Sequence, residues 1–230
     1  MADPTPRENF QEMRKRPRDE FMAYLWDYYS KPALVVLIVL VCIGSFIYEL
    51  ATKKDVVLCG MMMDAYNLHD DAPIHEDFSE YLGIDTKKED VYFMNNLSMV
   101  SEDLQLQKES NEIFFTKTAA KEVDIITLCT VQFQMYERDL MQDLRLVLSE
   151  EQLAAVGDHV YYVDMANLVP GSTDPTGFED PVPVGIDMNG CEKFAEYYMP
   201  ANNDCIMGIC SNSEHPENAA KFVEFLFPID

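Results

Sequence analysis

The chain has 230 residues, of which 48% are hydrophobic and 25% are charged. These proportions are those of a globular protein, and the apolar content is too high for a disordered acidic chain. Lysine and arginine together number 17 against 41 aspartates and glutamates, so the formal net charge is −24. A surface this acidic repels a phosphate backbone, so we do not expect nucleic acid as a partner.

The first predicted element is an apolar helix over residues 32–51. Residues 32–48, PALVVLIVLVCIGSFIY, contain no charged side chain. At about 1.5 Å per residue the whole segment spans about 30 Å, the thickness of a bilayer core. Pro32 is expected in the first turn, where proline removes no helical hydrogen bond. We expect an uncleaved helix that crosses the lipid bilayer through residues 32–51; a cleaved signal peptide and a buried soluble helix are the alternatives.

Basic residues flank this segment unequally. The residues before it are Arg14, Lys15, Arg16, Arg18 and Lys31, and those after it are Lys53 and Lys54. Because the more basic flank stays in the cytoplasm, residues 1–31 are expected to form a cytoplasmic juxtamembrane arm. Residues 52–230 are then the extracellular domain of a single-pass cell-membrane protein. This outer part keeps 11 bases and 34 acids, so it carries nearly all of the negative charge.

Strand and helix patterns alternate through this outer part. The strands are expected at 55–63, 90–94, 123–128, 159–163, 184–188 and 205–210. The helices are expected at 75–82, 101–120, 132–140, 149–156 and 216–226. Ser149 and Gln152 match a capping box, and the proline- and glycine-rich residues 168–183 are expected to form a long loop. The alternation predicts a three-layer α/β/α domain with a mostly parallel, mixed sheet that is covered on both faces.

The end of the chain carries the most specific motif. Residues 205–227, CIMGICSNSEHPENAAKFVEFLF, place a strand before a proline-initiated helix with an apolar face. The residues that form this motif are Ser213, Pro216, Glu217, Ala219, Phe222, Val223 and Leu226. The motif and the β-α-β order resemble the extracytoplasmic solute-binding proteins of bacterial ABC importers, in the type II periplasmic-binding-protein class. The short arm, single span and following Lys-Lys-Asp also resemble single-span surface proteins of Gram-positive gut bacteria.

This resemblance implies a solute-binding-protein-like fold in an outer part with the length of one full lobe and a reduced second one. It also implies a non-enzymatic module that captures a small solute or a partner protein at the cell surface. Two other functions stay open: a surface scaffold or assembly protein that binds no ligand, and an enzyme.

Polar residues follow the first three predicted strands, and open α/β sheets bind ligands at the carboxyl ends of their strands. The candidate ligand-binding residues are Asp64, Tyr66 and Asn67 after the first strand, Asn95 and Asn96 after the second, and Thr130 and Gln132 after the third. Tyr66 offers a ring for stacking, and the amides offer hydrogen bonds. The alternative is that asparagine and aspartate occupy turns because they tolerate the backbone angles there.

No catalytic motif stands out, since the chain has neither a Gly-x-Ser-x-Gly elbow nor a Gly-rich phosphate loop. The polar run at 67–77 includes His69 and His75, but its spacing matches no EF-hand or zinc motif, so we expect a solvated loop. The methionines at 61–63 are expected in the core, because adjacent side chains of a strand face opposite ways. We therefore expect no enzyme, no metal and no cofactor.

Five of the six cysteines follow the apolar segment. Cys59 and Cys129 lie in apolar runs and are expected to be small buried side chains. Cys191 has Cys205 or Cys210 as a possible disulfide partner, and the spacing leaves the pairing open. The chain contains no Cys-x-x-Cys pair, so neither a zinc ribbon nor a thioredoxin-type site is indicated.

Overall fold

The structure is a computed structural model that describes residues 10, 14, 17–68, 73–163 and 181–229. The chain divides into two compact units, Met1–Lys53 and Lys54–Asp230. The first contains the apolar helix and the second contains the α/β domain. Most of the predicted loop at 168–183 and the residues around His69 lie outside the described residues.

The first unit is built on one long helix, α2 (Arg18–Thr52). Within it, Lys31–Glu49 has a mean hydropathy of 2.3, and none of its residues is buried. By length and composition it is the one described helix able to cross a membrane, as an anchor or as a secretion signal. The predicted start at Pro32 is corrected, because the helix begins at Arg18 and Pro32 lies inside it. The residues before Pro32 are themselves helix-forming, and Asp19 and Glu20 occupy the first turn, where the helix dipole favours acids.

The described part of the second unit contains the six predicted strands and the five predicted helices, together with two short strands and one short helix that were not predicted. Its strands are β1 (Asp55–Met63), β2 (Ala65–Asn67), β3 (Glu89–Leu97), β4 (Ile125–Leu128), β5 (Val160–Val163), β6 (Val182–Asp187), β7 (Tyr198–Pro200) and β8 (Ile206–Ile209). Its helices are α3 (Pro73–Leu82), α4 (Leu104–Ala119), α5 (Thr130–Leu140), α6 (Glu150–Val156), α7 (Glu192–Ala195) and α8 (Pro216–Leu226). Short 3-10 turns are η1 (Leu144–Leu146), η2 (Gly157–His159) and η3 (Ala201–Asn203). The capping box of Ser149 and Gln152 at the start of α6 is confirmed.

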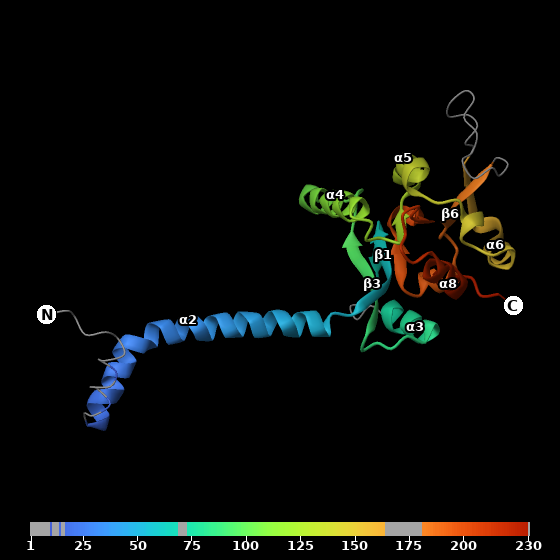
Figure 1. Ribbon diagram of the computed structural model, residues 1–230. Coiled ribbons are helices and arrows are strands. Elements are labelled where there is room, and N and C mark those ends of the chain that lie inside the picture. The colour runs from blue at the N-terminus through green and yellow to red at the C-terminus, as the bar shows by residue number, and fades with distance from the viewer. Residues whose placement is uncertain (1–9, 11–13, 15–16, 69–72, 164–180, 230) are drawn as a thin grey trace. The chain divides into compact units, whose positions relative to one another are not determined.

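Six strands form one mixed sheet in the order β3-β1-β4-β8-β6-β5 (Figure 1). β1 pairs parallel with β3 and with β4, whereas β4–β8, β8–β6 and β6–β5 are antiparallel. The α/β class is confirmed, but the prediction of a mostly parallel sheet is corrected. A parallel return needs a crossover of a dozen or more residues, usually a long helix. The chain from β6 to β8 contains no long helix, only the four-residue helix α7, the short strand β7 and the turn η3, and β8 starts at the edge where β6 ends and runs back.

Both faces of the sheet are covered by buried apolar side chains. On one face Met62 packs with Phe78 of α3 and Phe222 of α8. On the other face the methionines at 61 and 63 pack with Phe114 of α4 and Phe133 of α5. All three methionines are fully buried and alternate between the faces, which confirms their expected place in the core. The result is a three-layer domain in which α4 and α5 cover one face and α3, α6 and α8 cover the other (Figure 1).

One edge of the sheet gathers strand ends from most of the domain. Leu128 at the end of β4 and Asp187 at the end of β6 both pair with Ile206 at the start of β8. The carboxyl ends of β1 and β3 meet at the same edge, where Met63 pairs with Leu97. A separate two-stranded antiparallel ribbon, β2–β7, continues from β1 at this edge. We call this side of the domain the carboxyl edge.

Candidate functional site

Asp64 is a buried structural anchor at the carboxyl edge. Its side chain is fully buried, and Oδ1 accepts hydrogen bonds from Ser98 Oγ at 2.7 Å, Met99 N at 2.9 Å and Val100 N at 3.3 Å. A carboxylate that accepts backbone N–H groups holds the loop that follows β3. Asp64 itself has φ of +54°, a left-handed conformation that aspartate tolerates at turns. The structure thus gives Asp64 a role within the fold.

Two further predicted residues are engaged inside the protein. Asn95 Oδ1 accepts a 2.8 Å hydrogen bond from the Tyr198 hydroxyl. The Thr130 backbone N–H donates to Asp204 Oδ1 at 3.0 Å, and the Thr130 hydroxyl donates to the same oxygen. These contacts fix the β2–β7 ribbon and the segment before β8 against the parallel half of the sheet.

The other candidates lie around the carboxyl edge without meeting in one cavity. Tyr66 is 39% exposed on β2, and Asn67 of the same strand pairs with Tyr198. Asn96 is exposed with φ of +60°, inside β3, and Gln132 is half-buried in the first turn of α5. The predicted strand ended before Asn95 and the predicted helix began at 132, so both elements are longer than expected.

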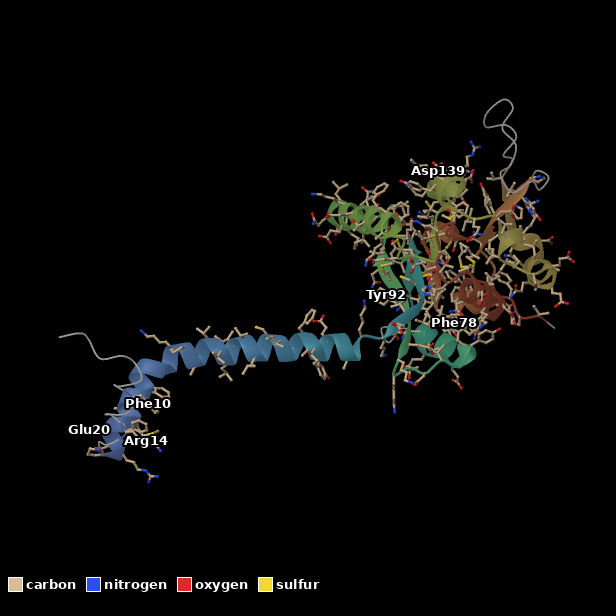
Figure 2. All side chains as sticks on the ribbon, viewed as in Figure 1. Phe10, Arg14, Glu20, Phe78, Tyr92 and Asp139 are labelled. Atoms are coloured by element: carbon tan, nitrogen blue, oxygen red, sulfur yellow. The ribbon has the colours of Figure 1, made fainter. Side chains whose placement is uncertain are left out.

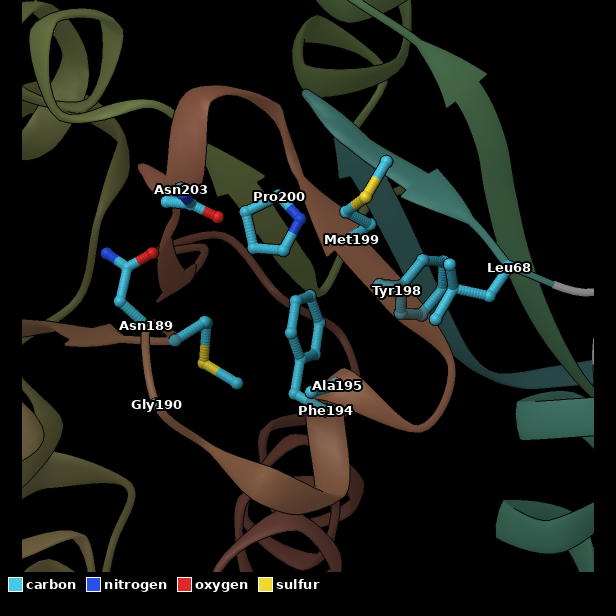
Figure 3. A pocket seen from close by; sticks show the side chains of 10 residues that line it. Leu68, Asn189, Gly190, Phe194, Ala195, Tyr198, Met199, Pro200 and Asn203 are labelled. Carbon is cyan, nitrogen blue, oxygen red and sulfur yellow. The ribbon is translucent and has the colours of Figure 1, made fainter.

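The carboxyl edge carries a pocket of about 420 Å³. Its lining residues are Leu68, Met188, Asn189, Gly190, Phe194, Ala195, Tyr198, Met199, Pro200 and Asn203 (Figure 3). They come from the end of β2, the end of β6, helix α7, β7 and the segment before β8. None of the seven predicted residues lines this pocket, although two of them touch its lining: Asn67 precedes Leu68 and pairs with Tyr198, and Asn95 accepts a hydrogen bond from Tyr198.

The pocket is polar at one end and apolar at the other. Figure 3 shows the amides of Asn189 and Asn203 on one side, with Met199 and Leu68 on the opposite side. Asn189 is held in place because its Nδ2 donates to Asp187 Oδ1 at 2.6 Å. Small-molecule sites commonly combine an apolar lining with a few oriented polar groups, as this pocket does.

Sequence reasoning missed this lining because the residues become neighbours only when β8 returns antiparallel beside β6. A signal was nonetheless present in the turn residues. Gly190, Asn202 and Asn203 all have positive φ, and glycine and asparagine are the residues that adopt such angles most readily. The runs Asp-Met-Asn-Gly and Ala-Asn-Asn-Asp therefore mark two tight turns at the ends of strands.

A serine, a histidine and an aspartate also meet before α8. Ser213 Oγ donates to Asp124 Oδ1 at 2.6 Å, and His215 Nδ1 lies 3.3 Å from Asp124 Oδ2. Serine and histidine both bond to the carboxylate, whereas a nucleophilic site needs the histidine to accept the serine proton. Asp124 also accepts from the His215 and Cys59 backbone N–H groups. This cluster therefore anchors the start of α8, where His215 is the N-cap residue.

The cysteines are free thiols in the structure. Cys59 and Cys129 are buried, as predicted, and of the candidate disulfide partners Cys191 and Cys205 pack on one face of the sheet and Cys210 on the other. Burial raises the pKa of both Cys59 and Cys210 to about 12, which keeps these thiols protonated at neutral pH.

Metal-binding geometry is absent from the described part of the chain, where no three His, Cys, Asp or Glu side chains form a group that could hold an ion. His75 of the polar run instead pairs with Asp90, with Nε2 2.8 Å from Oδ1. His69 lies outside the described residues.

Comparison with known proteins adds no identification. No family model matches the chain, and neither curated proteins nor solved structures give a significant match.

Proposed function

We propose that the chain is a single-pass, membrane-anchored binding module whose extracellular domain captures a small solute in the carboxyl-edge pocket. The observation that carries this proposal is the position of the pocket. In α/β sheets ligands bind outside the carboxyl ends of the strands, where loops converge. The pocket lies at that edge, and its volume of about 420 Å³ is within the usual range for small-molecule sites.

The proposed topology rests on the apolar segment and its flanks. An uncleaved Lys31–Glu49 anchor holds the domain at the membrane, and the more basic N-terminal flank keeps the arm in the cytoplasm. The acidic domain then lies outside, where its charge keeps it soluble and repels it from anionic lipid.

The resemblance to solute-binding proteins supports the same proposal. The motif around Ser213 and Pro216 forms the anchored start of a buried helix, and strands alternate with helices before it. The domain is one compact unit with a small ribbon beside the sheet. We infer that binding uses one lobe with an open pocket, and needs no closure of two lobes on the solute.

Anchoring and topology are tested on intact cells and isolated membranes. We expect the full-length chain to stay in the membrane fraction after carbonate washing, and external protease to remove the domain from intact cells. Release of the chain by carbonate, or protection of the domain from external protease, would contradict the proposed topology.

Solute binding is tested by thermal shift on the full chain in lipid nanodiscs. Sugars, short peptides and divalent ions are screened against the wild type and an Ala195→Trp variant. Ala195 is an exposed lining residue, so tryptophan fills the pocket without entering the core. Ala154→Trp on α6 is the matched control, because Ala154 is exposed and does not line the pocket. A compound that stabilises the wild type and the control but not Ala195→Trp supports the proposal; a screen without such a compound counts against it.

One observation favours a second candidate function, a surface scaffold that binds another protein. Tyr66, Leu68 and Met199 are 39%, 47% and 53% exposed. Tyr66 pairs directly with Met199, so the two side chains lie on the same face of the ribbon. A photo-crosslinker at Met199 should then yield a specific adduct with a second protein. The same group at Met135, an exposed methionine on α5, should not.

A further inference from the structure

We infer that the ligand of the carboxyl-edge pocket combines an apolar body with a cationic end, as in an aralkyl amine. This inference rests on the proposed function and specifies the class of solute that the pocket takes. Three features of the described residues carry it. They are the uncharged lining, the charge of the rim, by which we mean the strand-end segments of the carboxyl edge, and two carboxylates next to the polar end of the pocket.

The lining favours an apolar body. Every lining residue is uncharged. The two amide side chains of the lining, Asn189 and Asn203, lie together at one end of the pocket. The hydroxyl of Tyr198, a third polar group, is already bonded to Asn95. A highly polar ligand would lose its water shell against Leu68 and Met199 without gaining enough hydrogen bonds in return.

The rim disfavours an anion. The strand-end segments at this edge are residues 98–103, 129–130, 157–159, 187–190 and 201–205. Together they contain five carboxylates, His159, and no lysine or arginine. Lys193 of the neighbouring helix α7 is neutralised by Glu196 at 2.7 Å and lies over the rings of Tyr197 and Phe225. The local field therefore attracts a cation and repels an anion.

Two of these carboxylates belong to residues that lie next to the polar end of the pocket in the chain but do not line it themselves. Asp187 and Asp204 lie within two residues of the lining amides, Asn189 and Asn203. Asp187 Oδ1 accepts hydrogen bonds from the backbone N–H and the side-chain amide of Asn189, and Asp204 Oδ1 accepts them from the backbone N–H and the hydroxyl of Thr130. Within the described part of the chain, no hydrogen bond reaches the Oδ2 atom of either residue. Neither carboxylate lines the pocket, so an ammonium group at the polar end would be attracted by their negative charge across Asn189 and Asn203.

The test uses three probes that share one apolar body and differ in charge: phenethylamine, phenethyl alcohol and phenylpropionate. Binding is measured by calorimetry on the full-length chain in nanodiscs of zwitterionic lipid. We expect affinity to fall from the amine to the alcohol to the carboxylate. Between amine and carboxylate the expected ratio is about tenfold at low salt, and it shrinks as salt screens the rim.

Substitutions test which residues produce the expected preference for the amine. Asp204→Asn keeps an oxygen for Thr130 but removes the charge, so the amine should bind several-fold more weakly while the alcohol binds unchanged. Asp139→Asn, an exposed residue near the far end of α5, is the matched control and should alter neither probe. Ala195→Trp should abolish binding of all three probes.

Equal or tighter binding of phenylpropionate, or amine binding that survives Ala195→Trp, would overturn the inference. So would the absence of amine binding altogether. In that case the thermal-shift screen tests the proposed function separately. If a compound of another class stabilises the wild type but not Ala195→Trp, solute binding in the pocket still holds. If no compound does so, the proposed function is also contradicted.

Discussion

The hydroxyl of Tyr198 donates a 2.8 Å hydrogen bond to Oδ1 of Asn95, which joins the β2–β7 ribbon to the edge strand β3. Tyr198 is 1% exposed, stacks on Phe194 and forms part of the pocket wall. This contact therefore couples the stability of the domain to the shape of the pocket. The contact lies in the second unit. Figure 2 shows that the side chains of this unit are densely packed.

Tyr198→Phe should destabilise the domain by about 1 kcal/mol, because it removes one hydrogen bond and leaves the partner amide short of a donor. The measurement is denaturant unfolding. Tyr92→Phe is the control, on strand β3 with Asn95. Tyr92 is 52% exposed, so this substitution should not measurably change the free energy of unfolding. Equal effects of the two substitutions would show that the Tyr198–Asn95 contact contributes nothing specific.

Asp124→Ala should cost about 3 kcal/mol or more, because it removes the acceptor of the buried Cys59 N–H and of the half-buried Ser213 hydroxyl, and one of the two acceptors of the His215 N–H. Ser213→Ala removes only one of these bonds and should cost about 1 kcal/mol. Thermal and denaturant unfolding both report the difference. A loss for Asp124→Ala no larger than that for Ser213→Ala would mean that the carboxylate does not anchor α8.

Gly185→Ala should destabilise the domain by about 1–3 kcal/mol through overpacking. A Cβ at this position would lie 2.7 Å from both Ile206 Cγ2 and Phe133 Cζ, and both side chains are buried. The control is Gly44→Ala in α2, where a Cβ meets no atom within 4 Å. Unchanged unfolding of Gly185→Ala would show that α5 shifts away from the sheet at no cost.

Stability should fall as the pH rises above 9. Burial raises the pKa of Cys59 and of Cys210 from 9.0 to about 12, so between these values the folded chain holds protons that the unfolded chain has lost. Because the folded state binds more protons, the free energy of unfolding decreases by up to about 1.4 kcal/mol per pH unit for each thiol. Denaturant unfolding between pH 8 and 10.5 measures this slope. Cys59→Ala should reduce it and Cys42→Ala should not; an unchanged slope in both variants would contradict the assignment.

Local patterns were enough to predict most elements. The uninterrupted apolar run DVVLCGMMM defines β1 without ambiguity, and the Ser149 capping box and Pro216 set the starts of α6 and α8. The predicted ends of two elements were wrong, because both elements extend further than their local sequence pattern indicates. Pairing with β1 carries β3 on to Leu97, and α5 begins at Thr130, two residues before the predicted start, with Cys129 at its N-cap.

The candidate site was predicted only as a location. The sequence points to the carboxyl edge because local patterns predict where each strand ends along the chain and which turn residues follow it. It does not place Met188, Asn189 and Asn203 together, because they meet only through the pairing of β6 with β8. The predicted polar residues Asp64, Asn95 and Thr130 instead make hydrogen bonds inside the fold.

The sequence by itself determined the apolar helix, the acidic α/β domain and the buried methionine strand, because each depends on composition and on the short-range period of apolar residues. Only the tertiary structure decided the direction of β8, the partners of the buried carboxylates and the lining of the pocket. These depend on contacts between residues far apart in the chain, as between Asn95 and Tyr198, and no local pattern records which distant groups will meet.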